Sequence, residues 1–352
     1  MSISTGATRA GLPYQFRTAS ALGYDPAALD GIGLCLREEY EDTYVDPEVY
    51  DAARMEADVR EGRLVAAVAF TPDGVPMACL CLRENAPFTG VGDLCMHVVR
   101  KPFRGKGLGA PLVKFVVELP EAACFSAIGA HNATFHTMSQ RESWAGGLRP
   151  CGLLLSLYRS QGFRHSHPNV GDKLSYAVST RAPAEAGEET LYVPRQHLRF
   201  LEEVYAGLGV SPRFAPPCAE TGRAPSLLTP VQDERHNTLL TAIERCGPDL
   251  GARCAGLLRQ YAKRPMQTAT FCVNALSPTA PAGCAALEGL GFRFTGVQPF
   301  CREAHYLLYH HPMGVAVPFD ELQIDETFRP VLHYVRAQFA APAAQLTGGV
   351  RA

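Results

Sequence analysis

A strand, a glycine-rich turn and a helix follow one another between residues 91 and 120, and this stretch constrains the fold more than any other. The apolar run Val91–Val99 passes into a cationic turn, after which apolar residues recur at helical spacing until Pro120. This order of elements leaves unpaired backbone N–H groups at a helix N-terminus, where they can bind an anion. The sequence therefore predicts a phosphate-binding turn.

The composition of the turn favours a pyrophosphate. Arg104 and Lys106 supply positive charge, and alternate glycines let the backbone approach a phosphate closely and adopt positive φ. Two common phosphate loops do not match. A Walker A loop needs Ser or Thr directly after Lys106, and a dinucleotide fingerprint needs a glycine where this chain has Leu112.

The turn instead has the pattern Arg-x-x-Gly-x-Gly from Arg104 to Gly109, five residues after Val99. With the valine-rich strand before it and the amphipathic helix after it, this pattern resembles the acyl-CoA-binding segment of the GNAT superfamily of N-acetyltransferases. The resemblance implies that the loop amides hold the pyrophosphate of coenzyme A and that the preceding strand receives the thioester. The residues that it assigns to the acyl-CoA are Val98, Val99, Arg104, Gly105, Lys106, Gly107, Leu108 and Gly109.

Composition and charge indicate a two-domain cytoplasmic protein. A chain of 352 residues with 47% hydrophobic content can build two cores, and a net charge of −2 argues against a general role in binding nucleic acid or a membrane surface. The 12 cysteines are dispersed without a Cys-x-x-Cys motif, and the N-terminus lacks a signal-type apolar stretch. We therefore expect reduced thiols and a cytoplasmic location.

The predicted elements of the first half follow the order of the GNAT fold. Residues 1–12 are expected to be loose, and the elements around the turn are strands over 14–20, 64–71, 75–83 and 123–130 and helices over 25–39 and 47–61. Residues 131–140 should enter a further helix. The resemblance thus covers about half the chain and implies an α/β fold with a mixed, mostly antiparallel sheet flanked by helices.

The second half repeats the alternation of strands and helices after the polar linker 181–189. Its segment Ala286–Phe292 resembles the helix ending of a GNAT domain, but Pro248 and Asp249 stand where a phosphate turn belongs. Pro248 has no N–H to donate, and Asp249 would repel a pyrophosphate. We therefore expect two tandem GNAT-like domains, a catalytic one over 1–182 and a degenerate one over 190–345, with a final helix over 327–339 capped by Thr327.

Acyl transfer to an amine needs a base for the amine and a proton donor for the thiolate. Many relatives carry a glutamate base on the strand before the loop, where this chain offers Asp93 and His97. An imidazole titrates near neutral pH and suits a base. Because side chains alternate along a strand, Asp93 and His97 should share one face with Val99, provided that no bulge intervenes. His131 and His136 follow the next strand and could line the same cleft.

Two residues compete as the proton donor. The tyrosine of Leu157–Phe163 resembles the residue that protonates the coenzyme A thiolate in many relatives, but there it follows an asparagine by about seven residues, and seven residues after Asn132 is Ser139. Some double-domain relatives carry His-x-x-Ser-Gln here, which His136–Gln140 matches. The resemblance favours Ser139, with His136 one turn earlier to pass a proton, and leaves Tyr158 as the alternative.

The sequence thus predicts an N-acyltransferase that uses acetyl-CoA or another acyl-CoA and acylates an amine of a small molecule or peptide. Tyrosines near the first two helices could line the acceptor pocket: Tyr14, Tyr24, Tyr40, Tyr44 and Tyr50. No metal is expected, because Asp93, His131 and His136 are too loosely spaced. Two alternatives remain: a non-catalytic tandem module that binds coenzyme A or acyl-CoA, and a transferase whose donor is an acyl carrier protein docked on the basic patch Arg100, Lys101, Arg104 and Lys106.

Overall fold

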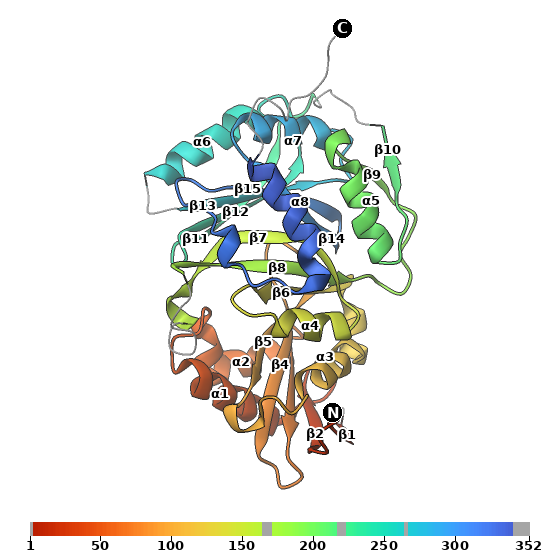
Figure 1. Ribbon diagram of the computed structural model, residues 1–352, viewed down its shortest axis with the longest axis vertical. Coiled ribbons are helices and arrows are strands. Elements are labelled where there is room, and N and C mark those ends of the chain that lie inside the picture. Colours follow the sequence, from red (N-terminus) through yellow and green to blue (C-terminus); the bar gives the residue numbers. More distant parts are fainter. Residues whose placement is uncertain (1–2, 164–170, 217–222, 264–266, 341–352) are drawn as a thin grey trace.

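A computed structural model describes residues 3–163, 171–216, 223–263 and 267–340. One 13-stranded sheet runs through both halves of the molecule in the order β1-β2-β3-β4-β5-β6-β8-β7-β14-β15-β13-β12-β11 (Figure 1). Its strands are β1 (Ile3–Ala7), β2 (Pro13–Ala19), β3 (Leu64–Phe70), β4 (Pro76–Glu84), β5 (Val91–Val99), β6 (Ala127–Ala133), β7 (Arg149–Arg159), β8 (Lys173–Arg181), β11 (Leu227–Asp233), β12 (Thr238–Arg245), β13 (Thr268–Asn274), β14 (Arg293–Cys301) and β15 (Ala304–His311). A separate parallel pair consists of β9 (Thr190–Tyr192) and β10 (Arg213–Ala215).

The sheet is mixed and mostly antiparallel, with two parallel pairs, β5·β6 and β12·β13. The halves join where β7 runs antiparallel to β14, with Gly152 opposite Gly296. A side chain cannot be accommodated at this junction, because a Cβ on Gly152 would lie 2.9 Å from the Thr295 carbonyl oxygen. From the junction outward, both halves have the same order of pairings: antiparallel, antiparallel, parallel and antiparallel.

Helices cover both faces of the sheet in the first half. They are α1 (Pro26–Tyr40), α2 (Ala52–Arg60), α3 (Gly109–Val117) and α4 (Met138–Ala145). Alternate residues of β3 divide between two cores: Ala66 and Val68 pack with residues of α1, whereas Val65 and Ala67 pack with residues of α3. Because both faces of β3 are buried, the strand has no polar residues.

The helices of the second half are α5 (Leu198–Gly207), α6 (Leu250–Ala262), α7 (Ala280–Gly289) and α8 (Arg329–Ala340). The last helix, α8, packs against both β7 and β14 and so covers the junction of the two halves (Figure 1). Asp325 precedes it, and its carboxylate accepts a hydrogen bond from the Thr327 N–H at 3.2 Å. The predicted cap at Thr327 is therefore wrong: Asp325 caps a short 3-10 turn, and the α-helix begins at Arg329.

Most predicted elements are confirmed, and the misses have local causes. Residues 3–7, expected to be loose, pair with β2 as β1. The predicted helix 47–61 is a 3-10 turn followed by α2, because Asp51 is extended and caps α2 through the Arg54 N–H at 3.0 Å. The strand expected over 123–130 begins only at Ala127. Strands β8 and β11 were not predicted, and β11 is an edge strand that contains Pro230.

Within the described residues, no helix is both long and apolar enough to cross a membrane. No group of three or more His, Cys, Asp or Glu side chains in these ranges is placed to hold a metal ion. Residues 341–345 of the expected second domain lie outside the described part of the chain.

Candidate functional site

Two parallel strands of the first half separate partway along their length. β5 and β6 pair from Val91 opposite Ala127 to Leu94 opposite Ala130, although β5 continues to Val99 and β6 to Ala133. Beyond the last pair the sheet is open between them. The side chains and backbone of both strand ends are therefore available to line a cavity.

A bulge in β5 lies at the same place. The register against β4 shifts between Cys79 and Cys81, and Met96 has a φ of +52°. Because the bulge adds one residue, Cys95, Met96 and Val98 all pack on the α1 side, whereas Leu94 and Val99 pack on the α3 side.

This geometry contradicts the expectation that Asp93 and His97 share a face. The alternation restarts after the bulge, so His97 joins Val99 on the α3 side and Asp93 joins Cys95 on the opposite side. A bulge depends on how the neighbouring strand pairs, and the sequence of β5 gave no sign of it.

Two cavities meet where the strands separate. The loop cavity, of about 450 Å³, is lined by the glycine turn, by the end of β5 and by α4. The inner cavity, of about 360 Å³, lies deeper between the strands. Four residues line both cavities: Tyr40, His97, His136 and Ser139. Of the residues assigned to the acyl-CoA, all except Lys106 line the loop cavity.

The glycine turn is open to a ligand. Gly105 and Gly107 have φ values of +73° and +76°, and a Cβ built on either would meet no heavy atom within 4 Å. The helix that follows has no side-chain cap at Leu108, so its first N–H groups are not used by a capping side chain. Backbone geometry therefore fits the predicted anion site.

Much of the positive charge near the turn is neutralised by α1. Arg104 donates to the Val99 carbonyl oxygen at 2.8 Å and to Glu39. Arg100 donates to Glu38 at 2.6 Å. The Lys106 ammonium lies 5.6 Å from the Phe103 ring centre. The patch proposed for a carrier protein therefore has less unpaired charge than the sequence suggested.

His97 stands between the cavities and is held from α4. Its Nδ1 lies 3.5 Å from a carboxylate oxygen of Glu142. Its Nε2 is buried and has no hydrogen-bond partner in the described part of the chain. Buried polar atoms are almost always paired, so this atom is available to bond with a molecule that enters the cavity. We read the contact as Nδ1–H facing Glu142, which leaves Nε2 as an acceptor.

The sequence did not identify Glu142. It follows Ser139 by one helical turn, and its carboxylate lies so close to Gly109 that a Cβ there would collide with it. Gly109 thus has a second role, because it leaves room for Glu142. Helical spacing from Ser139 was the one available signal.

Both halves of the molecule hold α4. The buried Asn132 on β6 accepts from the Ser143 hydroxyl at 2.7 Å and donates to Ser179 at 2.9 Å. Gln140 donates to the Gln323 carbonyl at 2.9 Å and accepts from the Asp325 N–H at 2.8 Å. Strand β6 therefore holds the second turn of α4 at Ser143, and the second half holds the first turn at Gln140.

This turn carries Ser139, the predicted proton donor. The Ser139 hydroxyl oxygen is buried and has no hydrogen-bond partner among the described residues. Its rival Tyr158 lies on β7 and lines only the inner cavity of the two. Burial raises the pKa of Tyr158 well above its ordinary value, so the phenol stays protonated.

Asp93 lies in the inner cavity beside His131. One of its carboxylate oxygens accepts from the Asn85 amide at 3.0 Å and lies 3.4 Å from His131 Nδ1, whereas the other is buried without a partner in the described ranges. Burial lowers the pKa of His131, but the charge and hydrogen bond of Asp93 and a hydrogen bond with Gln298 outweigh it and raise the pKa above the ordinary value. The Asp93 carboxylate thus favours the protonated form of the His131 imidazole.

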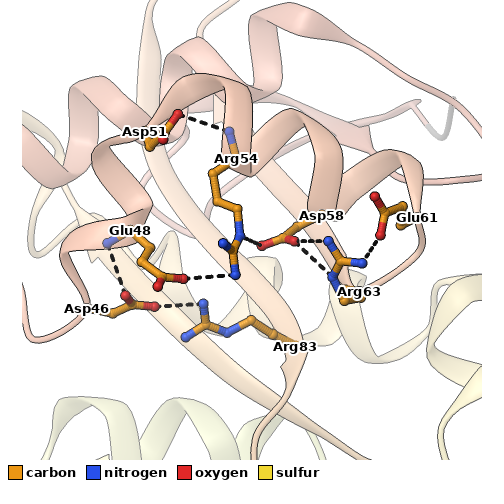
Figure 2. A network of polar contacts seen from close by, with 8 residues as sticks. All are labelled: Asp46, Glu48, Asp51, Arg54, Asp58, Glu61, Arg63 and Arg83. Carbon is orange, nitrogen blue, oxygen red and sulfur yellow. Dashed lines mark hydrogen bonds and ion pairs between the residues drawn. The ribbon is translucent and has the colours of Figure 1, made fainter.

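Asp46 and Arg83, which line the inner cavity, belong to a wider network of charged side chains (Figure 2). Arg83 donates to Asp46 at 2.8 Å, and the other oxygen of Asp46 accepts from the Glu48 N–H at 3.1 Å. Arg54 then bridges Glu48 at 3.2 Å and Asp58 at 3.6 Å. Asp46 and Arg83 line the cavity as an ion pair.

The corresponding region of the second half is closed. β12 and β13 stay paired from Thr238 opposite Thr268 to Ile243 opposite Val273. Beyond the last pair, the Asn274 amide on β13 donates to Glu244 on β12 at 3.1 Å. A side-chain bond thus connects these strands where β5 and β6 part.

The turn before α6 is also filled by the chain itself. Asp249 accepts from the Ser226 N–H and hydroxyl, both at 2.7 Å, and the Gly247 N–H donates to Ser226 at 2.9 Å. A Cβ on Gly247 would collide with the Ala224 carbonyl oxygen. Gly247 and Asp249 of this turn are thus bonded to Ser226.

Comparison with known proteins agrees with the first half of this description. Residues 32–141 match the model of the acetyltransferase (GNAT) family. A comparison with curated proteins found no match.

Several solved structures align with about half of the chain. The ribosomal-protein-S5-alanine acetyltransferase of Vibrio fischeri is 12% identical and covers 52% of this chain and 98% of its own, with a TM-score of 0.37. A phosphinothricin acetyltransferase of Sinorhizobium meliloti, in complex with AcCoA, is 21% identical and covers 48% and 88%, with a TM-score of 0.36. A variant of the spermidine N-acetyltransferase of Vibrio cholerae is 11% identical and covers 48% and 93%, with a TM-score of 0.37. Residues 32–141, which contain the open turn and the bulged strand, carry the sequence pattern of the acetyltransferase (GNAT) family.

Proposed function

We propose that this chain is an N-acyltransferase that transfers the acyl group of acetyl-CoA, or of another acyl-CoA, directly to an amine of a small molecule or peptide. The observation that carries the proposal is the meeting of two cavities at His97, His136 and Ser139, where buried polar atoms of His97 and Ser139 lack partners among the described residues. The family match of residues 32–141 supports the choice of reaction.

Each cavity has a separate task in this proposal. The loop cavity holds the acyl-CoA, with its pyrophosphate at the backbone of residues 104–109 and its thioester beside Val98 and Val99. The inner cavity holds the amine, next to the unpartnered oxygen of Asp93. The two reactants then meet at the opening between β5 and β6, which brings them together without a covalent enzyme intermediate.

His97 acts as the base. Its Nε2 takes a proton from the acceptor ammonium, and the free amine attacks the thioester carbonyl. The tetrahedral adduct collapses with cleavage of the carbon–sulfur bond, and its nitrogen loses its second excess proton to the departing thiolate or to solvent. The Ser139 hydroxyl donates a hydrogen bond to the thiolate. A serine hydroxyl can do this without ionising. The proton on His97 then returns to solvent or to the thiolate.

Glu142 positions this base. With Nδ1–H directed at the carboxylate, the imidazole presents Nε2 to the reactants, as in other carboxylate–histidine pairs. Glu142→Gln should lower kcat/KM about tenfold, because the imidazole is no longer oriented with Nε2 toward the reactants. Gly109→Ala should have the same effect by displacing the carboxylate. An unchanged kcat/KM in both variants would limit Glu142 to a structural role.

We also propose that residues 190–345 are a degenerate copy of the first unit that does not bind coenzyme A. The matching order of strand pairings around the β7–β14 junction supports a copy. The self-bonded turn around Asp249 supports its degeneracy.

The test of the proposed function is amine-dependent release of coenzyme A thiol. Purified chain is incubated with acetyl-CoA and a panel of amines, and free thiol and acylated product are followed by absorbance and mass spectrometry. We expect at least one amine to yield both products in equal amounts, and His97→Gln to abolish most of this turnover. Binding of coenzyme A without thiol release for any amine would instead favour a non-catalytic binding module.

A further inference from the structure

The inner cavity has a wall that comes from the second half of the chain. Three residues at the β11–β12 turn line it: Asp233, Arg235 and His236. His236 is buried, with 6% of its surface exposed, and its ring lies 4.7 Å from the ring of Tyr158. No sequence pattern predicted this contact, because residues 233–236 are far from residues 93–97 along the chain.

Hydrogen bonds hold the turn in one place against the first half. His236 Nδ1 accepts from the Arg159 N–H at 3.2 Å, and its Nε2 lies 3.2 Å from the Val45 carbonyl oxygen. Arg235 donates to the same carbonyl at 3.2 Å. Asp233 accepts from the His236 N–H at 3.0 Å, which fixes the turn internally.

These bonds assign one tautomer to His236. Because Nδ1 accepts a proton and a carbonyl oxygen can only accept, Nε2 must carry the hydrogen. Burial lowers the pKa of His236, so the ring stays neutral near pH 7. The wall is thus a fixed, neutral imidazole flanked by Asp233 and Arg235.

Six aromatic side chains line the cavity together with charged residues such as Asp46, Arg83 and Asp93. The aromatic residues are Tyr40, Tyr44, Phe135, Tyr158, Phe163 and Tyr176. Of the five tyrosines proposed from the sequence, only Tyr40 and Tyr44 are among them. A cavity of about 360 Å³ falls in the size range of small-molecule sites and is too small for the surface of a folded protein.

We propose that the Asp233–His236 turn is the specificity wall of the acceptor site, and that the acceptor is a small amine with an apolar or aromatic body. This inference rests on the proposed acyltransferase function. The amine faces Asp93 and His97, the body packs against the aromatic walls, and the far end contacts the turn. The second half would then serve the reaction by selecting the acceptor.

The test compares wild-type chain with His236→Ala, His236→Gln and Arg235→Ala over a panel of small amines and lysine peptides. We expect both alanine variants to raise KM for the best small amine about tenfold and to change the order of preference, because each removes a pocket contact. His236→Gln should restore part of the loss, since a side-chain amide can both donate and accept. The dissociation constant of coenzyme A, measured by calorimetry, should not change in any variant.

The matched control is Arg259→Ala, which removes an exposed arginine of α6 that lines neither cavity. Thermal unfolding identifies any variant that fails to fold. If His236→Ala does not fold, Arg235→Ala still provides the test. Unchanged KM and preference in Arg235→Ala and both His236 variants would overturn the inference while leaving the acyltransferase intact. A peptide lysine that exceeds every small amine in kcat/KM would also overturn it. If the wild-type chain acylated no amine, both the proposed function and this inference would be overturned.

Discussion

The two parallel strand pairs of the sheet occupy matching places in the two halves, but they differ at their ends. β5 and β6 separate after Leu94 and Ala130, and a glycine turn with open backbone follows. β12 and β13 remain paired to Ile243 and Val273 and are then joined by the Glu244–Asn274 hydrogen bond. Topology alone therefore does not open a cavity at the end of a parallel strand pair. The register of the pair and the turn after it determine whether the end is open.

The buried groups of the two regions differ in the same way. In the first half, His97, Ser139 and Asp93 each have a buried polar atom without a partner among the described residues. In the second half, the corresponding polar groups of Glu244, Asn274 and Asp249 bond to one another or to the backbone. Unpaired buried groups cost stability, and three of them line the cavities at the open pair. The second half also has buried polar atoms without a partner among the described residues, at Asn237, Thr241 and His310.

The largest expected effect tests which half binds coenzyme A. Gly107→Asp should abolish binding, because it places a carboxylate where the pyrophosphate is expected and strains a residue with positive φ. Asp249→Asn, its counterpart in the second half, should leave one coenzyme A bound per chain. Calorimetry measures both. A stoichiometry of two in the wild-type chain would break the comparison.

The next effect concerns the base at the open strand pair. His97→Gln should lower kcat/KM by about 10²-fold, within the range for a lost general base, and should remove the acid limb of the pH–rate profile. Glu244→Gln, at the end of the closed pair, should leave both unchanged. Steady-state kinetics between pH 6 and 9 provide the measurement. An unaltered profile in His97→Gln would make water the base.

A smaller loss is expected for the proton donor. Because a thiol has an ordinary pKa of about 8.5, removal of the donor should cost little near neutral pH and more at higher pH. Ser139→Ala should show this dependence, and Tyr158→Phe should not. The two variants are compared by kcat at pH 7 and pH 9. A large loss confined to Tyr158→Phe would reverse the assignment.

The smallest effect concerns stability at the closed pair. Lys173 donates to Asn237, Thr238 and Thr268 at 2.9 to 3.2 Å, and burial lowers its pKa to about 7. Between about pH 7 and 10.5 the unfolded chain therefore binds more protons at this residue than the folded chain.

The sign follows from that difference. The contribution of Lys173 to the free energy of unfolding rises with pH across this window and is lost as the pH falls toward 7. Urea unfolding of the wild-type chain and of Lys173→Met at several pH values should show a difference that grows in favour of the wild type as pH increases. Parallel curves would mean that the folded lysine stays charged.

Local patterns were sufficient for most elements and for the glycine turn. The structure places α1 over Pro26–Tyr40, one residue from the predicted bounds 25–39, and Asp25 caps it through the Ala27 N–H at 3.0 Å. Helical period, caps and turn glycines depend on residues a few positions apart, so the sequence displays them directly. The same holds for the loop residues 104–109. Their conformational freedom comes from the glycines and their charge from Arg104 and Lys106, and both can be read from the sequence.

Tertiary structure alone decided the composition of the site. The bulge at Met96 depends on the register against β4, and it places His97 and Asp93 on opposite faces of β5, although both line the inner cavity. Glu142 reaches His97 from another element, and His236 reaches Tyr158 from the other half. A one-residue change of register reverses every later side chain of a strand, and contacts between distant segments form only when the sheet closes. The sequence thus determined which residues could do chemistry, whereas packing determined which of them meet.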